Sequence, residues 1–143
     1  MIVKIINKSN NPLPEFKTSG SAGMDICANN STDWILIPGV IALIPTGIFM
    51  EIPQGYECQV RSRSGLALNN GIVVANSPGT IDSDYRGELK VIVANQGTEP
   101  YTVKTGERIA QLVFNKIEQP TFYVVEELAP TERNEGGFGS TGK

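Results

Sequence analysis

Glycine and proline interrupt this chain so often that long helices are excluded. Its 143 residues include 15 glycines and 9 prolines, and no stretch longer than about eight residues keeps a helical period of apolar side chains. Runs rich in β-branched and aromatic residues lie between these breaks, at intervals of about 8–12 residues. This spacing predicts a mainly β fold, a distorted jelly roll or β-barrel with at most one short helix.

The alternation of apolar and polar residues gives the expected elements. The short helix begins near Leu66, and Gly71 suits the left-handed residue that ends such a helix. The expected strands lie near residues 3–6, 35–44 (two strands around the Pro38–Gly39 turn), 46–52, 56–60, 72–75, 89–93, 101–104, 108–114 and 121–128.

Composition limits the possible functions. The net charge is −3 and no basic block is present, so binding to nucleic acid or to a membrane surface is not expected. Residues 34–50 are apolar but contain two Pro and two Gly, so they cannot form a spanning helix. Nothing resembles a signal peptide, and we expect a soluble, cytoplasmic protein. Cys27 and Cys58 fit no metal-ligand spacing and are expected to be buried free thiols.

The absence of histidine is the sharpest exclusion. The sequence contains none, which rules out Ser-His-Asp catalysis, Cys-His catalysis and His-ligated metals. Proton transfer in an enzyme of this composition must fall to carboxylates. Any metal must be a hard ion with oxygen ligands, such as Mg²⁺.

Residues 76–90, here called the central segment, concentrate turn residues, two acids and an aromatic ring. Asn76 and Gly79 lead to Asp82, Asp84 and Tyr85, and the strand at 89–93 follows. We expect a tight hairpin that offers backbone groups and a carboxylate to a planar ligand. The alternative is that the Asp and Asn side chains only build the turn, which is their usual role.

Two further stretches carry polar groups suited to phosphate. Residues 61–65 read Arg-Ser-Arg-Ser-Gly, which combines guanidinium forks, hydroxyl donors and an unobstructed backbone; a solvated basic turn is an equally good explanation. Residues 130–143 hold four glycines around Phe138, with Arg133, Ser140 and Thr141 nearby. Such a terminus is usually disordered, but it can also close over a ligand. We expect one domain over residues 1–130 and a mobile arm over 131–143.

Five motifs in order make the chain resemble the trimeric dUTP diphosphatases (dUTPases) over essentially its whole length. They are residues 22–28 (AGMDICA), 63–67 (RSGLA), 79–87 (GTIDSDYRG), 106–112 (GERIAQL), and Arg133 with 136–142 (GGFGSTG). The resemblance implies Mg-dependent hydrolysis of dUTP to dUMP and diphosphate, in a homotrimer with shared active sites. In a cell this reaction keeps uracil out of DNA and supplies dUMP for dTMP synthesis.

The resemblance also implies roles for individual residues. Asp82 would be the general base that activates water for attack on the α-phosphorus, and Tyr85 would pack under the deoxyribose and exclude a 2′-hydroxyl. Mg²⁺ would be held by phosphates and water with no direct protein ligand, and Asp25 would act in its outer shell. Uracil contacts would come from Asn76, Gly79, Thr80, Ile81, Asp82, Lys90 and, by stacking, Phe138. Phosphate contacts would come from Arg63, Ser64 and Gly65 of a neighbouring subunit, Gln111, Arg133, Gly139, Ser140 and Thr141.

Two positions depart from the family pattern. Ser62 stands where the family usually has proline, so we expect a less rigid loop there. Asn134 stands where glycine often follows the arginine, and asparagine tolerates the left-handed conformation better than most residues. Of the two central acids, we expect Asp84 to hydrogen-bond its own backbone and Asp82 to do the chemistry.

Two other functions remain open from the sequence. A dCTP deaminase, mono- or bifunctional, shares the architecture but needs a different acid-base residue and does not typically end in such an arm. A catalytically inactive nucleotide-sensing module is the alternative from a different class. If the protein is an enzyme, Asp82→Asn should abolish its turnover. A sensor would show no turnover to lose.

Overall fold

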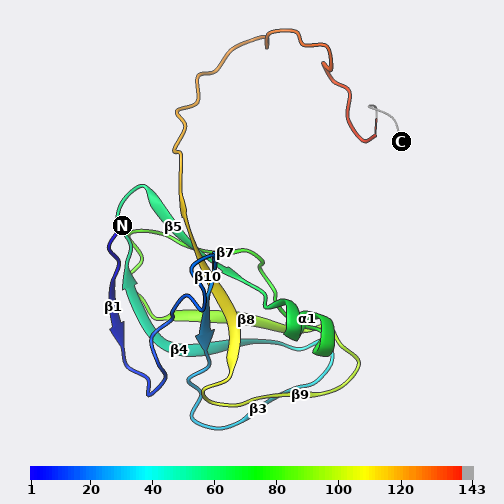
Figure 1. Ribbon diagram of the computed structural model, residues 1–143. Helices are drawn as coiled ribbons and strands as arrows, with labels where there is room; N and C mark the ends of the chain where they lie inside the picture. Colours follow the sequence, from blue (N-terminus) through cyan, green and yellow to red (C-terminus); the bar gives the residue numbers. More distant parts are fainter. Residues whose placement is uncertain (140–143) are drawn as a thin grey trace.

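The computed structural model describes residues 1–139, which form ten strands and one short helix (Figure 1). The elements are β1 (Lys4–Asn7), β2 (Met24–Cys27), β3 (Trp34–Leu36), β4 (Ile41–Glu51), β5 (Tyr56–Arg61), α1 (Ser64–Asn70), β6 (Ile72–Val74), β7 (Gly79–Ile81), β8 (Leu89–Asn95), β9 (Tyr101–Val103) and β10 (Arg108–Lys116).

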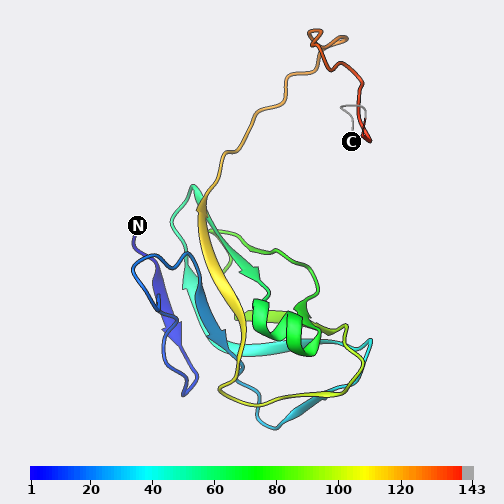
Figure 2. The same cartoon turned by 45° about the vertical axis from the view of Figure 1, so that its right-hand side comes forward.

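The strands form three antiparallel sheets. The first has the order β1-β4-β8-β6, the second β2-β10-β5-β7, and the third is the pair β3-β9. Figure 2 shows the two larger sheets curving around a common interior, with α1 in front of the strands in this view. The packing is jelly-roll-like, as predicted, but the sheets do not close into a barrel over the described residues. Each four-stranded sheet keeps two unpaired edges.

Alternation along β8 illustrates how the sequence builds the core. Leu89, Val91 and Val93 are almost fully buried, whereas Lys90 between them is exposed. Successive side chains of a strand point to opposite faces, so the predicted period of two is confirmed. Burial of these branched side chains against the facing sheet stabilises the fold by about 1.5–3 kcal/mol for each side chain.

β4 is longer than predicted. The expected break near Pro45 is absent, and one strand runs from Ile41 to Glu51. The register with β8 shifts between Pro45 and Ile48, and Gly47 adopts a φ of 71° there. A bulge therefore absorbs the proline without ending the strand.

The helix agrees with the prediction. It spans Ser64–Asn70, and the N–H of Gly71 donates to the carbonyls of the last turn in a left-handed cap with φ 67°. The first turn has no side-chain cap from Arg63.

The C-terminal part differs from the prediction. β10 ends at Lys116, and residues 117–139 leave the sheets as an extended segment that projects from the core (Figure 1). The predicted strand at 121–128 is wrong for the single chain, because this segment has no sheet partner within the described residues. Four of its apolar side chains, Phe122, Tyr123, Val124 and Leu128, are about 90% exposed, and Val125 is half exposed. The domain boundary at residue 130 stays a prediction.

None of the helices among the described residues is long and apolar enough to cross a membrane.

Candidate active site

The central segment crosses between the two large sheets. β7 pairs with β5 in the second sheet, whereas β8 pairs with β4 and β6 in the first. The segment is therefore not a hydrogen-bonded hairpin, which corrects the expectation from its turn residues. Residues 82–88 instead form a loop between sheets.

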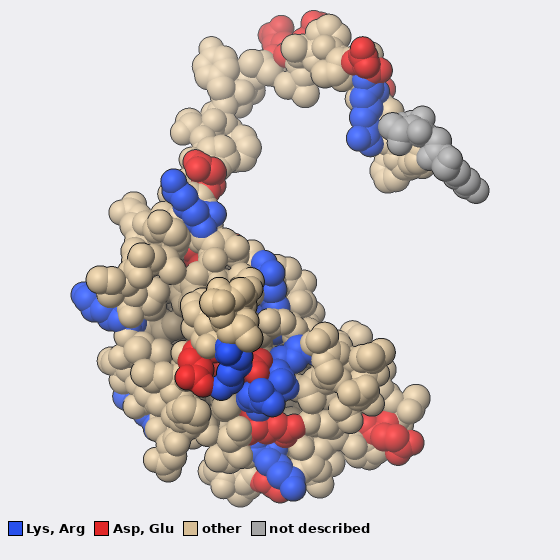
Figure 3. All heavy atoms as spheres, viewed as in Figure 1, with Lys and Arg blue, Asp and Glu red and all other residues tan. Residues whose placement is uncertain are grey.

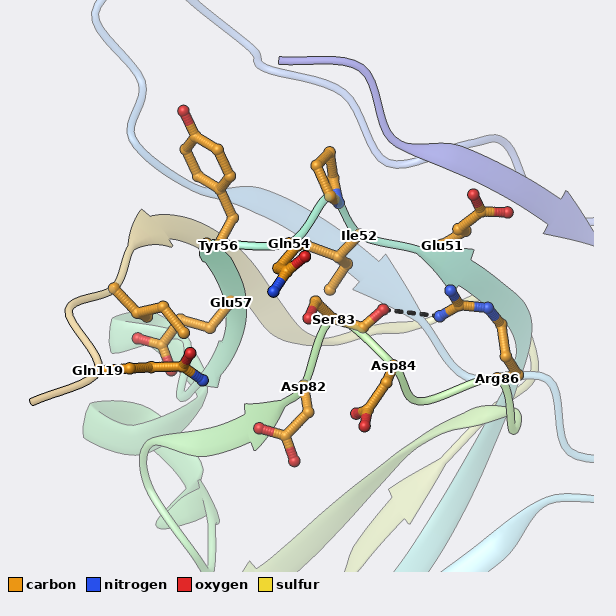
Figure 4. A pocket seen from close by; sticks show the side chains of 13 residues that line it. Glu51, Ile52, Gln54, Tyr56, Glu57, Asp82, Ser83, Asp84, Arg86 and Gln119 are labelled. Atoms are coloured by element: carbon orange, nitrogen blue, oxygen red, sulfur yellow. Dashed lines mark hydrogen bonds between the residues drawn. The ribbon is translucent and has the colours of Figure 1, made fainter. Parts of the chain in front are cut away.

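Asp82 and Asp84 lie on this loop beside a hollow of about 640 Å³. In Figure 4 both carboxylates extend from the same side of the loop, away from Arg86. Within residues 1–139 neither carboxylate accepts a hydrogen bond, so the backbone bond expected for Asp84 is wrong. The main chain closes the turn instead: the Tyr85 N–H donates to the Asp82 carbonyl at 3.2 Å, and Arg86 Nη1 donates to the Ser83 carbonyl at 2.7 Å.

Tyr85 is held against its own loop. Its hydroxyl donates to the Glu88 carbonyl at 3.0 Å, while the side chain stays about half exposed. The Glu88 carboxylate in turn accepts the N–H of Gly47 in the β4 bulge at 2.9 Å. The ring is thus tied through Glu88 to a core strand.

At the start of the central segment, the Asn76 side-chain amide lies close to Gly79, which has no side chain. A Cβ added at Gly79 would lie 3.2 Å from Asn76 Nδ2 and 3.4 Å from the Val60 side chain. Glycine therefore allows the Asn76 amide to lie close to the β7 backbone. The remaining central residues follow by register: Thr80 opposes Gln59, Ile81 opposes Cys58, and Lys90 opposes Pro45.

A second cluster of predicted residues surrounds Asp25 on β2. Asp25 Oδ1 accepts Arg63 Nε at 2.8 Å, and Oδ2 accepts Arg108 Nη1 at 3.0 Å. Arg63 also donates from Nη1 to the Arg108 carbonyl at 3.1 Å. The carboxylate is only about 21% exposed, so water screens these pairs less than it would on an open surface. Both guanidinium groups are held in fixed positions.

Arg108 was not among the predicted site residues. It stands three positions before Gln111, so in a regular strand the two side chains would point to opposite faces. A register shift between Arg108 and Ala110 inserts one extra residue and brings Arg108 to Asp25. The motif at residues 106–112 contains both residues and was the only sequence signal for Arg108. It did not reveal the bulge.

Gln111 and the loop after β5 are joined directly. Gln111 Nε2 donates to the Ser62 carbonyl at 2.9 Å, and the Val74 N–H donates to Ser62 Oγ at 2.9 Å. Ser62 therefore links the loop to β10 on one side and to β6 on the other. Ser64 and Gly65 follow at the start of α1, where both are exposed.

The two cysteines are free. Burial raises the pKa of the Cys58 thiol to about 12. Cys27 is only half-buried, which differs from the prediction, and its pKa is raised by burial and by the Asp25 carboxylate. Both thiols stay protonated near neutral pH.

One chain does not bring Asp82 close to the Asp25 cluster. Cys58 opposes Ile81, so continuation of the register sets Asp82 opposite Glu57. Arg63 follows Glu57 by six residues, which corresponds to roughly 20 Å of extended chain. That separation exceeds the reach of a triphosphate whose α-phosphorus lies beside Asp82. Figure 3 shows acidic and basic side chains intermixed on the viewed face, without one large basic patch.

The arm contributes a third set of predicted residues. Arg133 Nε donates to the Gly136 carbonyl at 2.6 Å, and Asn134 has a φ of 40°, as expected for the residue that replaces glycine. Phe138 is fully exposed, and Gly139 has a φ of 94°. Ser140 and Thr141 lie outside the described residues.

Metal ligation by the chain itself has little support. Over residues 1–139 no three Asp, Glu, Cys or His side chains lie close enough together to hold a metal ion. Both oxygens of Asp25 are already engaged by arginines.

Comparison with known proteins gives consistent relatives. Residues 9–142 match the dUTPase family model. A deoxyuridine 5′-triphosphate nucleotidohydrolase from Finegoldia magna is 56% identical over 142 residues, covering 99% of both chains. One from Fusobacterium nucleatum is also 56% identical, covering 99% of this chain and 97% of the relative.

Solved structures agree with the sequence relatives. The dUTPase of Staphylococcus bacteriophage 80alpha with dUpNHpp superposes with a TM-score of 0.89 at 29% identity, covering 99% of both chains. The dUTPase of S. aureus phage phi11, described with a structural Mg(II) ion, has a TM-score of 0.80 at 26% identity and covers 89% of this chain and 98% of that one. The fold, the motifs and the full-length matches together show that this chain belongs to the dUTPase family.

Proposed function

We propose that this protein hydrolyses dUTP to dUMP and diphosphate, with Asp82 as the general base. The observation that carries the proposal is the Asp82 carboxylate, which lies beside a hollow and accepts no hydrogen bond from residues 1–139. A carboxylate without a structural partner is available to take a proton. Relatives at 56% identity that carry the name of this activity support the same reaction.

The chemistry needs one proton acceptor and several positive charges. Asp82 takes a proton from water as the water oxygen bonds to the α-phosphorus, and the bond from that phosphorus to the bridging oxygen of the leaving diphosphate breaks. The guanidinium of Arg63 binds the phosphates and offsets their charge, with Ser64, Gly65 and Gln111 as further donors. Fixed positions for Arg63 and Arg108 around Asp25 reduce the reorganisation needed when the anion arrives.

Selection of base and sugar belongs to the central segment. The Asn76 amide and the backbone of Gly79, Thr80, Ile81 and Lys90 read the uracil edge, and the Tyr85 ring packs against the deoxyribose. The arm, residues 131–143, closes over this site. Phe138 stacks on uracil, while Arg133, Gly139, Ser140 and Thr141 hold the terminal phosphate.

In this proposal Mg²⁺ binds to the phosphates of the substrate and not directly to the protein. Held by the substrate phosphates and water, the ion would offset negative charge and help to orient the α-phosphorus. Asp25 is positioned by two arginines, and it can reach such an ion through water in the outer shell. A relative described with a structural Mg(II) ion makes the metal a reasonable partner for the family.

A homotrimer with shared sites completes the proposal. The separation of roughly 20 Å between Asp82 and Arg63 within a chain argues that a neighbouring copy supplies the phosphate-binding residues. Exposed apolar side chains on β3 and β4, among them Ile35, Ile41 and Leu43, and those of the extended segment at 122–128 need a cover that further copies provide. A cytoplasmic location remains part of the proposal.

The first experiment supplies Mg²⁺ and one nucleotide at a time: dUTP, dTTP, dCTP or UTP. Diphosphate released from dUTP alone supports the proposal, including its base and sugar selectivity. Ammonia released from dCTP would favour the deaminase alternative. Binding of dUTP without turnover would favour the sensing module. Light scattering that gives a monomer mass would contradict the shared site.

A further inference from the structure

Gly87 lies against the hydroxyl end of the Tyr85 side chain. A Cβ built on Gly87 would lie 2.5 Å from Tyr85 Cζ and 2.9 Å from Cε2, and it would meet the hydroxyl oxygen even more closely. Real Cβ atoms essentially never approach other atoms so closely. The ring can therefore occupy its position only because residue 87 has no side chain.

The backbone gives no other reason for glycine at this position. Six glycines of the described chain have φ in the left-handed region, and Gly87 is not one of them. An alanine there would not meet the steric penalty of a left-handed φ. The requirement is steric and concerns a single neighbour, the Tyr85 side chain.

The ring has little freedom to move aside without loss. Its hydroxyl is bonded to the Glu88 carbonyl at 3.0 Å, and the Glu88 carboxylate is bonded to the Gly47 N–H in β4 at 2.9 Å. The next carbonyl, of Leu89, accepts the buried Thr46 hydroxyl. Residues 88 and 89 are thus fixed to the bulge of a core strand, so a methyl group at position 87 would displace the ring rather than the backbone.

We propose that Gly87 is a positioning residue that sets the sugar selectivity of the site by fixing the height of the Tyr85 ring. This inference rests on the proposed hydrolysis of dUTP with Tyr85 against the deoxyribose. With its hydroxyl end packed against Gly87, the ring is held in one position. A 2′-hydroxyl is excluded only while the ring face stays within about one oxygen diameter of the sugar, so a small displacement opens room for it.

The test measures kcat and KM for dUTP and for UTP in the full-length protein and in Gly87→Ala. We expect the preference for dUTP, taken as the ratio of the two kcat/KM values, to fall about tenfold or more, since misplacement near 1 Å commonly costs a hundredfold in rate. Gly20→Ala is the matched control, because nothing lies within 4 Å of a Cβ added there. It should keep the wild-type ratio.

The Tyr85→Ala variant serves as a second background, which isolates the contact between residues 85 and 87. In Tyr85→Ala the preference should already be low, and adding Gly87→Ala should change neither the ratio nor the melting temperature. If Gly87→Ala alone does not fold, recovery of folding in the double variant supports the contact, and no recovery overturns it.

The outcomes separate this inference from the proposed function. Failure of the wild-type protein to hydrolyse dUTP would contradict the proposed function itself. A wild-type protein that prefers dUTP, together with a Gly87→Ala variant that loses activity equally on both nucleotides or keeps its preference, would overturn the role of Gly87 alone.

Discussion

The central segment and the Asp25 cluster hold their charged side chains in opposite ways. In the central segment the main chain and Tyr85 make the stabilising bonds, and Asp82 is left without a partner among residues 1–139. In the Asp25 cluster the carboxylate is bonded to both Arg63 and Arg108. The first region keeps a reactive group free, and the second keeps its cations in place. Substitutions should therefore separate activity from stability in one region and combine their loss in the other.

The largest effect is expected from Asp82→Asn. The amide keeps the shape of the side chain but cannot take the proton of water, so kcat should fall by about 10³-fold. The melting temperature and dUTP binding should stay unchanged, because the carboxylate makes no bond to residues 1–139. Steady-state kinetics and calorimetry measure these quantities.

The neighbouring Asp84→Asn serves as the control for Asp82→Asn. It removes the same charge from the same loop and should keep nearly full activity. Equal losses in the two variants would show that the charge of the loop, and not a base at position 82, matters.

Co-expression of Asp82→Asn with Arg63→Ala tests whether the two regions of one site come from different chains. Each variant alone should be almost inactive. In randomly mixed trimers with shared sites, about a quarter of the sites would combine an intact Asp82 with an intact Arg63 from the neighbour. Activity near that fraction of wild type supports the shared site, whereas a mixture as inactive as its components would contradict it.

Asp25→Asn should combine a loss of activity with a loss of stability. Two arginines would lose their shared anion, which should lower kcat/KM about 10- to 100-fold and the free energy of unfolding by about 2 kcal/mol. Because Asp25 is also the proposed outer-shell group for Mg²⁺, the Mg²⁺ concentration that gives half-maximal rate should rise. Kinetics over a Mg²⁺ series and denaturant titration measure both effects.

The exposed Asp33 provides the comparison for Asp25→Asn. Its carboxylate forms no ion pair with residues 1–139, so Asp33→Asn should change neither kcat/KM nor the free energy of unfolding. Wild-type stability in Asp25→Asn would show that the ion pairs contribute little and that the cluster is no more ordered than the central segment.

Local patterns predicted most of the fold. Leu89, Val91 and Val93 recur at every second position of a strand, and Gly71 ends the helix. Both features depend on neighbouring residues alone. The place of Arg108 depends on a bulge, which no period in the sequence announces. The apolar alternation at 121–128 shows that a strand can form, but not which chain would pair with it.

The acids of the central segment show the same limit at one loop. Asp84 was expected to bond its own backbone, yet the N–H of Tyr85 and the guanidinium of Arg86 close the turn on main-chain carbonyls instead. Several groups compete for each turn donor and acceptor. The sequence shows which residue types can form these hydrogen bonds. The path of the chain between the two sheets determines which of the bonds form.

The smallest effect concerns Ser62, which stands where proline is usual in the family. Val74, the last residue of β6, opposes Val93 in the ladder. The next N–H along the chain, of Ala75, donates to the Ile92 carbonyl. Donors alternate in direction along a strand, so the Val74 N–H points away from β8 and depends on Ser62 Oγ. Ser62→Ala should leave this donor unpaired and cost about 1 kcal/mol, lowering the melting temperature by about 3–5 °C.

Kinetics of Ser62→Ala then decide whether the bond also orders the Arg63 loop. KM for dUTP should rise a few fold while kcat holds, because the loop must be ordered on binding, and Ser62→Thr should restore both stability and KM. Ser31→Ala, at an exposed hydroxyl that makes no hydrogen bond to residues 1–139, controls for the substitution itself. An unchanged KM alongside the lower melting temperature would mean that the bonds of Arg63 to Asp25 and to the Arg108 carbonyl order the loop without Ser62.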